Sequence, residues 1–176
     1  MLVALTGTPG TGKSSVGRVL EARGYAIMDL DELARRNGLV KGRDRKRKAD
    51  EIDIDALREH IRVPAKSSKL AFLKSHYSHM MDVYHVVVLR CRPSVLRERL
   101  RARGWPAEKI REIVEAEALD VITQEAVGRT AWVSEIDTTD IQPEEAAAQV
   151  LAILQGQTEG HEPGRIDWTE EALTWS

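Results

Sequence analysis

Short apolar runs alternate along the chain with longer segments in which apolar residues recur every three or four positions. The apolar runs have the length and bounding residues of buried β-strands and cover Leu2–Thr6, Tyr25–Met28, Leu70–Leu73, Tyr84–Leu89 and Trp132–Ile136. The amphipathic segments predict helices over Lys13–Arg23, Asp55–Ile61, Pro93–Arg103, Glu108–Ala126 and Pro143–Leu154. Strands that alternate with helices favour a parallel sheet covered on both faces, so we predict a three-layer α/β architecture with five parallel strands.

Three segments depart from this alternation. Arg35–Asp50 is polar and rich in charge, and Gly104–Glu108 is a tight break between two predicted helices. We expect both to be insertions over the carboxyl edge of the sheet. Gly156–Gly164 has the Gly, Pro and polar composition of a linker, but apolar residues return at Ile166–Trp168 and Leu173–Trp175, so the end of the chain is expected to dock.

Composition narrows the class of protein. The chain has 176 residues with 26 Lys and Arg against 28 Asp and Glu, a formal net charge of −2, which suits one domain and argues against a surface built wholly for nucleic acid. Cys91 is the only cysteine, which excludes an internal disulfide and a cysteine zinc cluster. The chain lacks both a leader pattern and an apolar run near the ~18 residues of a membrane helix, so we expect a cytoplasmic protein without a membrane partner.

The strongest motif lies between the first predicted strand and the first predicted helix. Gly7–Ser14, with the sequence GTPGTGKS, matches the phosphate-binding pattern G-x-x-x-x-G-K-[ST] in the strand-loop-helix context that this pattern requires. Its glycines allow backbone N–H groups to point into one concavity, and the amino end of the helix adds partial positive charge. Lys13 is then expected to reach the β- and γ-phosphates, Ser14 to bind Mg²⁺ and Ser15 to contact the α-phosphate. The sequence therefore predicts binding of a nucleoside triphosphate.

A phosphate loop alone leaves GTPases, ATPases and small-molecule kinases open. The chain has no N-K-x-D motif for reading guanine, and its length leaves no room for oligomeric ATPase machinery. A nucleoside monophosphate kinase needs a triphosphate site, an insertion after the second strand for the acceptor and a short arginine-bearing lid that excludes water. The chain offers a candidate for each of these parts.

Taken in order, the motifs of this chain resemble the atypical adenylate kinases called isoenzyme six in animals, including archaeal members of that family. The resemblance rests on Gly7–Ser15, Asp29–Ala34, Ile52–Asp55, Ser75–His79, Arg103–Trp105, Lys109–Ile110, Glu115–Glu117 and Pro163–Trp168. It implies a P-loop kinase fold formed by residues 1–176 as one domain, and a broad nucleoside monophosphate kinase that uses ATP and Mg²⁺ with AMP as the favoured acceptor. It also implies weak ATPase activity and a part in late maturation of the small ribosomal subunit and its 16S rRNA precursor, through a platform ribosomal protein and rRNA.

The resemblance also implies roles for single residues. The ATP-binding loop would comprise Gly10, Thr11, Gly12, Lys13, Ser14 and Ser15. Arg103 would contact ATP as the first residue of a lid over about residues 103–113, His76 would be a polar active-site residue, and residues from about 29 to 52 would bind the monophosphate. Residues 156–176 would form the C-terminal tail.

One position departs from the family pattern. The family carries an acidic residue two positions before the histidine, where this chain has Lys74 before His76. A lysine there is expected to repel Mg²⁺ and to weaken ATP hydrolysis, which leaves the metal to Ser14 and the phosphates, with Asp29 or Asp31 as outer-shell helpers.

Other charged and polar residues leave alternatives open. Lys41–Lys48 carries six basic residues and one acid, and it is either a solvated loop, an acceptor-phosphate site or a surface for RNA. Arg90 or Arg92 is a candidate phosphate contact at the carboxyl edge of the sheet. The next helix carries three arginines expected to be solvated or ion-paired, namely Arg97, Arg99 and Arg101. His76 and His79, three positions apart, fit one helical face, but metal ligation is disfavoured because no third ligand is near.

Three functions remain in competition at this point. The leading hypothesis is a nucleoside monophosphate kinase, with Lys13, Arg103 and His76 at its catalytic centre. The second is an assembly factor that binds a small-subunit ribosomal protein under control of ATP, with vestigial kinase activity. The third is a kinase for another small acceptor, such as shikimate or gluconate.

Overall fold

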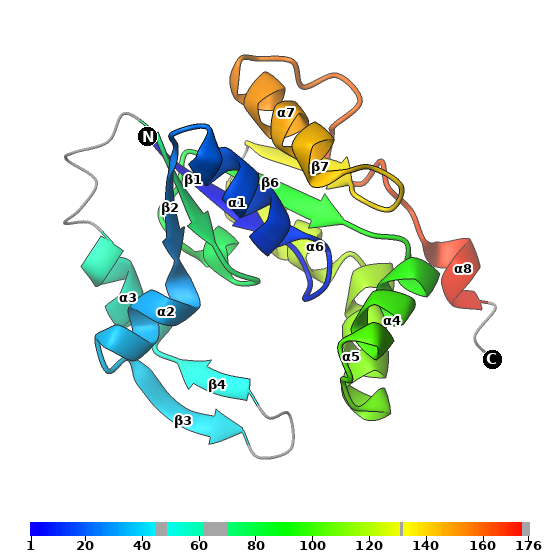
Figure 1. The fold of residues 1–176 in the computed structure, drawn as a ribbon, viewed down its shortest axis with the longest axis horizontal. Coiled ribbons are helices and arrows are strands. Elements are labelled where there is room, and N and C mark those ends of the chain that lie inside the picture. The colour runs from blue at the N-terminus through cyan, green and yellow to red at the C-terminus, as the bar shows by residue number, and fades with distance from the viewer. Residues whose placement is uncertain (45–48, 62–69, 131, 174–176) are drawn as a thin grey trace.

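A parallel five-stranded sheet forms the centre of the computed structural model, which describes residues 1–44, 49–61, 70–130 and 132–173. Its strands follow the order β2-β5-β1-β6-β7, and every neighbouring pair is parallel (Figure 1). The strands are β1 (Leu2–Thr6), β2 (Ala26–Asp29), β5 (Ala71–Lys74), β6 (His85–Arg90) and β7 (Val133–Asp137). The five predicted strands and their parallel arrangement are confirmed.

Helices cover both faces of this sheet because successive strand residues point to opposite faces. Val3 and Leu5 of β1 face α1 (Lys13–Ala22) and α7 (Pro143–Leu154), whereas Ala4 packs with Ala126 of α6 (Val121–Val127) on the other face. Each of these four residues is buried. The three-layer architecture is therefore confirmed.

The prediction of one continuous helix over Glu108–Ala126 is wrong. The structure has two helices, α5 (Ala107–Ala118) and α6, and the chain breaks between them at Asp120, whose φ is 53°. Aspartate tolerates this left-handed conformation better than most residues, and here its carboxylate is ion-paired to Arg90. A contact with a strand far away in the sequence therefore accompanies the break, and the helical periodicity could not reveal it.

The polar segment after β2 is more regular than its composition indicated. It contains α2 (Leu30–Arg36), an antiparallel hairpin of β3 (Val40–Asp44) and β4 (Ala49–Ile52), and α3 (Ile54–Ile61). Leu30 and Ala34 of α2 pack with Leu57 and Ile61 of α3, and the same cluster includes Leu73 of β5. The insertion thus has its own small apolar core joined to the sheet. Residues 45–48 of the basic run lie outside the described residues.

Besides the insertion, α4 (Pro93–Ala102) and α5 form a helix pair, whose members pack together through Leu96, Leu100, Ile110 and Val114. Figure 1 shows α2, α3 and the hairpin on one side and α4 and α5 on the other, both beyond the carboxyl edge of the sheet. Among the described residues, none of the helices is long and apolar enough to cross a membrane.

The C-terminal segment docks on the body of the protein. The backbone N–H of Glu135 on β7 donates to the carbonyl of His161 at 2.8 Å, and the N–H of Gly164 donates to the Glu135 carboxylate at 2.9 Å. The segment ends in α8 (Thr169–Leu173), where Glu171 accepts a hydrogen bond from the N–H of Ser94 at 2.6 Å. These contacts confirm that the end of the chain docks, although Trp175 and the rest of residues 174–176 lie outside the described residues.

Candidate nucleotide site

Three glycines with positive φ shape the loop between β1 and α1. Gly7, Gly10 and Gly12 have φ values of 138°, 96° and 103°. A Cβ on Gly7 would lie 2.4 Å from the carbonyl oxygen of Leu89, and one on Gly10 would lie 2.7 Å from Leu96 Cδ1, so neither position accepts a side chain. Gly12 caps α1 without a side chain, which leaves the amides at the start of the helix directed to an anion.

Lys13 is folded back onto this loop. Its Nζ donates to the carbonyl oxygens of Gly7 at 2.7 Å and Thr8 at 2.9 Å. Burial lowers the pKa of Lys13 to about 8, partly opposed by the negative charges of Glu117 and Asp31. The two carbonyl oxygens are neutral, whereas phosphate oxygens carry negative charge and form stronger hydrogen bonds with an ammonium group. The ammonium is therefore placed to replace its two carbonyl partners with phosphate oxygens.

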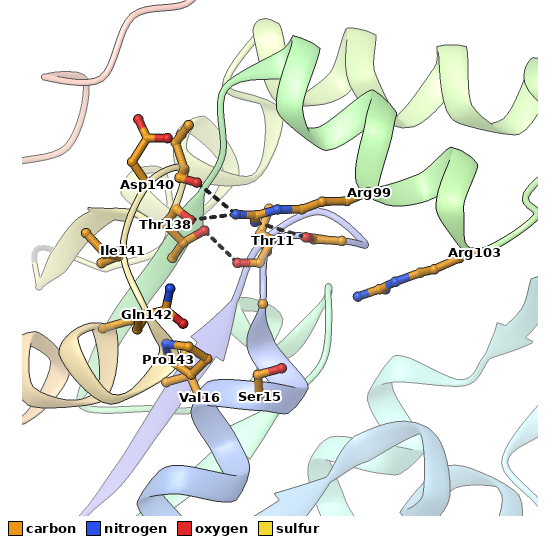
Figure 2. Close-up of a pocket in the computed structure, with 14 residues that line it drawn as sticks. Thr11, Ser15, Val16, Arg99, Arg103, Thr138, Asp140, Ile141, Gln142 and Pro143 are labelled. Carbon is orange, nitrogen blue, oxygen red and sulfur yellow. Dashed lines mark hydrogen bonds between the residues drawn. The ribbon is translucent and has the colours of Figure 1, made fainter.

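A cavity of about 370 Å³ opens beside the loop (Figure 2). Five residues predicted from the sequence line it, namely Gly10, Thr11, Gly12, Ser15 and Arg103. Its opposite wall is the segment from Thr138 to Pro143 between β7 and α7, and the first turn of α7. Ser14 lies in the first turn of α1 as an exposed residue outside this lining. The cavity therefore adjoins the anion site and has room for a further part of a nucleotide.

Arg99 joins the two walls of the cavity, a role the sequence did not reveal. From α4 its guanidinium donates to the carbonyls of Thr138 at 2.8 Å, Thr139 at 3.0 Å and Gly10 at 3.5 Å (Figure 2). Thr138 completes the link, since its hydroxyl donates to the carbonyl of Thr11 at 2.7 Å. The expectation of a solvated or ion-paired Arg99 is wrong, because its partners are backbone carbonyls of loops remote in sequence.

Arg103 directly follows α4 as its C-cap and is exposed, with its side chain pointing toward the phosphate loop (Figure 2). Its positive charge is one of the influences that lower the pKa of Lys13, so the two cations are near enough to interact. Gly104 follows with a φ of 71°, so the chain turns sharply directly after Arg103. This geometry fits the predicted arginine at the base of a lid.

On the other side of the loop, Lys74 is ion-paired. Its Nζ lies 2.7 Å from Asp29 Oδ2, while Asp29 Oδ1 accepts the backbone N–H groups of Asp31 at 3.0 Å and Glu32 at 3.2 Å as the N-cap of α2. Burial alone would raise the pKa of Asp29, but Lys74 and the helix amides bring it below its usual value. Lys74 is therefore largely neutralised, and Asp29 is committed to structure. Asp31, which accepts from the Tyr77 hydroxyl at 2.8 Å, remains the candidate outer-shell carboxylate.

The two histidines have different surroundings. His76 is exposed and lies edge-on to Tyr77, with ring centroids 5.0 Å apart; desolvation by its surroundings and then the charge of Lys13 lower its pKa. His79 is buried in a short 3-10 turn (Ser78–Met80) and bridges the Thr6 hydroxyl at 3.2 Å and the Glu125 carboxylate at 2.9 Å. They do not share a helical face, and the described residues contain no cluster of three metal-ligating side chains.

Arg90, the last residue of β6, and Arg92, two positions later, both have partners elsewhere in the protein. Arg90 is 1% exposed and is ion-paired to Glu117, Asp120 and Glu135. Arg92 lies over the ring of Trp168, 5.9 Å from its centroid. The idea that one of them contacts phosphate is therefore not supported, because tertiary partners occupy both.

Comparisons with known proteins agree with this geometry. The AAA domain family matches residues 3–120. An Archaeoglobus fulgidus protein named "Putative adenylate kinase" is 43% identical over 174 residues, covering 97% of this chain and 93% of its own. A Natronomonas pharaonis protein of the same name is 42% identical over 173 residues, covering 97% and 99%.

Solved structures show the same fold at low identity. The shikimate kinase from Acinetobacter baumannii in complex with shikimate has a TM-score of 0.61 at 17% identity, covering 89% of this chain and 93% of its own. The YorR protein from Bacillus subtilis in complex with phosphorylated GDP has a TM-score of 0.58 at 16% identity, covering 92% and 100%. The predicted P-loop kinase fold is confirmed.

Proposed function

Because the chain belongs to the AAA domain family and to the family of the archaeal proteins named "Putative adenylate kinase", we propose that it transfers the γ-phosphoryl group of ATP to a nucleoside monophosphate. AMP is the favoured acceptor, and the products are then two molecules of ADP. The observation that carries this proposal is the cavity of about 370 Å³ that continues from the phosphate loop between Arg99, Arg103 and the β7–α7 segment.

The donor nucleotide would occupy the loop and this cavity. Its phosphates would replace the Gly7 and Thr8 carbonyls as partners of Lys13 and accept hydrogen bonds from the amides that begin α1. The nucleoside would enter the cavity against the segment from Thr138 to Pro143. ATP specificity over GTP is supported by the absence of a guanine-reading motif from the sequence.

The residues present fit Mg²⁺ as a companion of the phosphates. Mg²⁺ favours oxygen ligands and commonly keeps several waters, so one protein hydroxyl with substrate phosphates is a sufficient donor set. Ser14 offers that hydroxyl in the first turn of α1, and Asp31 has a carboxylate near enough to Lys13 to raise its pKa. When bound, the ion supplies positive charge to the phosphoryl oxygens.

The acceptor would bind on the opposite side of the loop, in the insertion from about residue 29 to 52. Phosphoryl transfer asks little covalent chemistry of a protein, so this chain contributes position and charge. Lys13 holds the transferred group, Arg103 approaches it from the lid of about residues 103–113, and His76 gives the acceptor side a polar group. No side chain is required to act as a general base.

A coupled assay of ADP formation over a panel of acceptors tests this proposal. The panel contains AMP, the other nucleoside monophosphates, shikimate and gluconate, with ATP alone as the measure of hydrolysis. We expect the highest kcat/KM with a monophosphate and slow hydrolysis. ADP formation undiminished in Lys13→Ala, or a higher kcat/KM with shikimate or gluconate, would reject the assignment.

We further propose a role in maturation of the small ribosomal subunit, through a platform ribosomal protein and rRNA. Two features of the sequence support it: the resemblance of the motifs and the basic run that begins at Lys41. In the described part of this run, Lys41 is paired to Asp53 at 3.1 Å. A pull-down of small-subunit proteins with and without ATP tests it. Absence of enrichment in both states would contradict this role.

A further inference from the structure

A hydrogen bond inside the protein joins the phosphate loop to the C-terminal end of α5, the helix whose first residues belong to the proposed lid. The hydroxyl of Thr8 donates to Glu117 Oε2 at 2.7 Å, although 109 positions separate the two residues in the chain. Thr8 is 4% exposed and Glu117 is 2% exposed. The contact is therefore a buried hydrogen bond to a carboxylate, a class that is stronger than the neutral kind.

Glu117 is itself held from several directions. Its Oε1 accepts from Arg90 Nε at 2.8 Å and from the backbone N–H of Cys91 at 3.1 Å, and its own carbonyl accepts from Arg90 Nη2 at 3.0 Å. Arg90 is fixed in turn by its ion pairs with Asp120 and Glu135. The carboxylate thus has little freedom to move away from Thr8.

Thr8 is also the residue whose backbone Lys13 uses. The Thr8 carbonyl accepts from Lys13 Nζ at 2.9 Å and from the Thr11 hydroxyl at 2.9 Å. The side chain of Thr8 is therefore anchored by Glu117, while its carbonyl orients the lysine of the anion site. The Glu117 charge also raises the pKa of Lys13 against the effect of burial, which favours the charged ammonium.

The geometry points to Glu117 as a positioning residue for the donor phosphates, which acts through Thr8 and contacts no substrate itself. Removing the Thr8 hydroxyl leaves a buried carboxylate with one acceptor unpaired and frees the first half of the loop. The same carboxylate ties the C-terminal end of α5 to the loop, whereas the N-terminal end of α5 follows Arg103 closely. The kinetic consequence of this positioning rests on the proposed function, but its effect on ATP binding does not.

The test compares Thr8→Val with Thr8→Ser and with a matched control. Thr123 supplies the control because its hydroxyl donates to Glu135 Oε1 at 2.6 Å in the same buried cluster, away from the loop. The Kd of each full-length variant for ATP is measured by titration calorimetry, together with its Tm. Loss of one buried hydrogen bond predicts a Kd about fivefold or more above wild type for Thr8→Val. Thr8→Ser and Thr123→Val are expected within about twofold of wild type, although Thr123→Val should lower the Tm as Thr8→Val does.

Each outcome decides the matter. An unchanged Kd in Thr8→Val, an equal weakening in Thr123→Val, or a failure of Thr8→Ser to restore binding overturns the positioning role. Glu117→Gln gives a second measurement, since its amide keeps the volume and removes the charge; a Kd equal to wild type would also overturn it. If wild type binds ATP but forms no ADP with any monophosphate, the proposed function fails while this comparison remains valid.

Discussion

Lys74 Nζ lies 2.7 Å from Asp29 Oδ2, across two strands that pair Asp29 with Lys74 in register. The pair stands at the carboxyl edge of the sheet, where β2 leads into α2. Asp29 also caps α2 through its other oxygen. One carboxylate therefore joins the sheet, the helix that begins the proposed acceptor insertion and the lysine that departs from the family pattern expected from the sequence.

Removing the lysine should destabilise this junction. Lys74→Met is expected to lower the free energy of unfolding by about 1 kcal/mol, since the pair is partly exposed and its energy is reduced by solvent. The loss should shrink as the pH falls below the usual Asp value of 3.8. The folded pKa of Asp29 is depressed, so its stabilisation is present above the unfolded pKa and disappears on protonation. Urea unfolding over a range of pH measures this.

Asp29 itself separates two contributions. Asp29→Asn keeps an N-cap acceptor and loses the charge, whereas Asp29→Ala loses both and should cost about 1 kcal/mol more. Equal stability of the two variants would mean that the cap contributes nothing.

Lys41→Met serves as the control for Lys74→Met, because Lys41 also forms a surface ion pair but is 59% exposed. Its removal should change the free energy of unfolding less than the removal of Lys74 does.

Arg99 should matter for donor binding without any part in the chemistry. Arg99→Ala frees the segment from Thr138 to Thr139 and is expected to raise the KM for ATP about tenfold, with a smaller change in kcat. Arg99→Lys should not restore the KM, because one ammonium group cannot replace a planar guanidinium group that donates to three carbonyl oxygens. Arg101→Ala on the same helix is the control, since Arg101 is 61% exposed and pairs with Glu98. A KM for ATP restored by lysine would contradict the role given to the guanidinium group of Arg99.

Protonation of Lys13 should accompany ATP binding at high pH. The free protein has a Lys13 pKa of about 8, lowered by burial, so the amine is charged below that pH and largely neutral above it. Phosphate at the site favours the charged form and raises this pKa, so binding takes up a proton when the pH lies above about 8. Calorimetry in buffers of different ionisation enthalpy measures the proton count. An uptake that does not increase between a pH below this value and one above it would contradict the assignment.

The C-terminal segment should stabilise the fold more than its composition suggests. A chain ending at Gln155 loses the backbone bond of Glu135 to His161, the bond of its carboxylate to Gly164 and the contact of Arg92 with Trp168. We expect a loss of about 2 to 3 kcal/mol in unfolding free energy from these contacts together. Thermal unfolding followed by circular dichroism gives the shift in Tm. A Tm equal to that of the full chain would mean that the segment contacts the surface without stabilising the fold.

Local sequence patterns predicted the five strands of the sheet and the phosphate loop, but not the hairpin of β3 and β4 or the break between α5 and α6. The apolar run Tyr84–Leu89 has the length and residue types of a buried strand, and Gly7–Ser14 carries its geometry in its own glycines and helix start. A one-dimensional pattern records both features, although β6 pairs with β1 and β7 through residues far apart in the chain.

The tertiary structure decided which charges reach the site. Arg90, Arg92, Arg99 and Arg103 are alike in sequence, but only contacts with distant elements bury the first, place the second over Trp168, tie the third to backbone carbonyls and leave the fourth pointing to the loop. The partners of Thr8 and Lys74 were hidden for the same reason. The energy of a charged group depends on its burial and on its nearest partners, and folding alone brings those partners together.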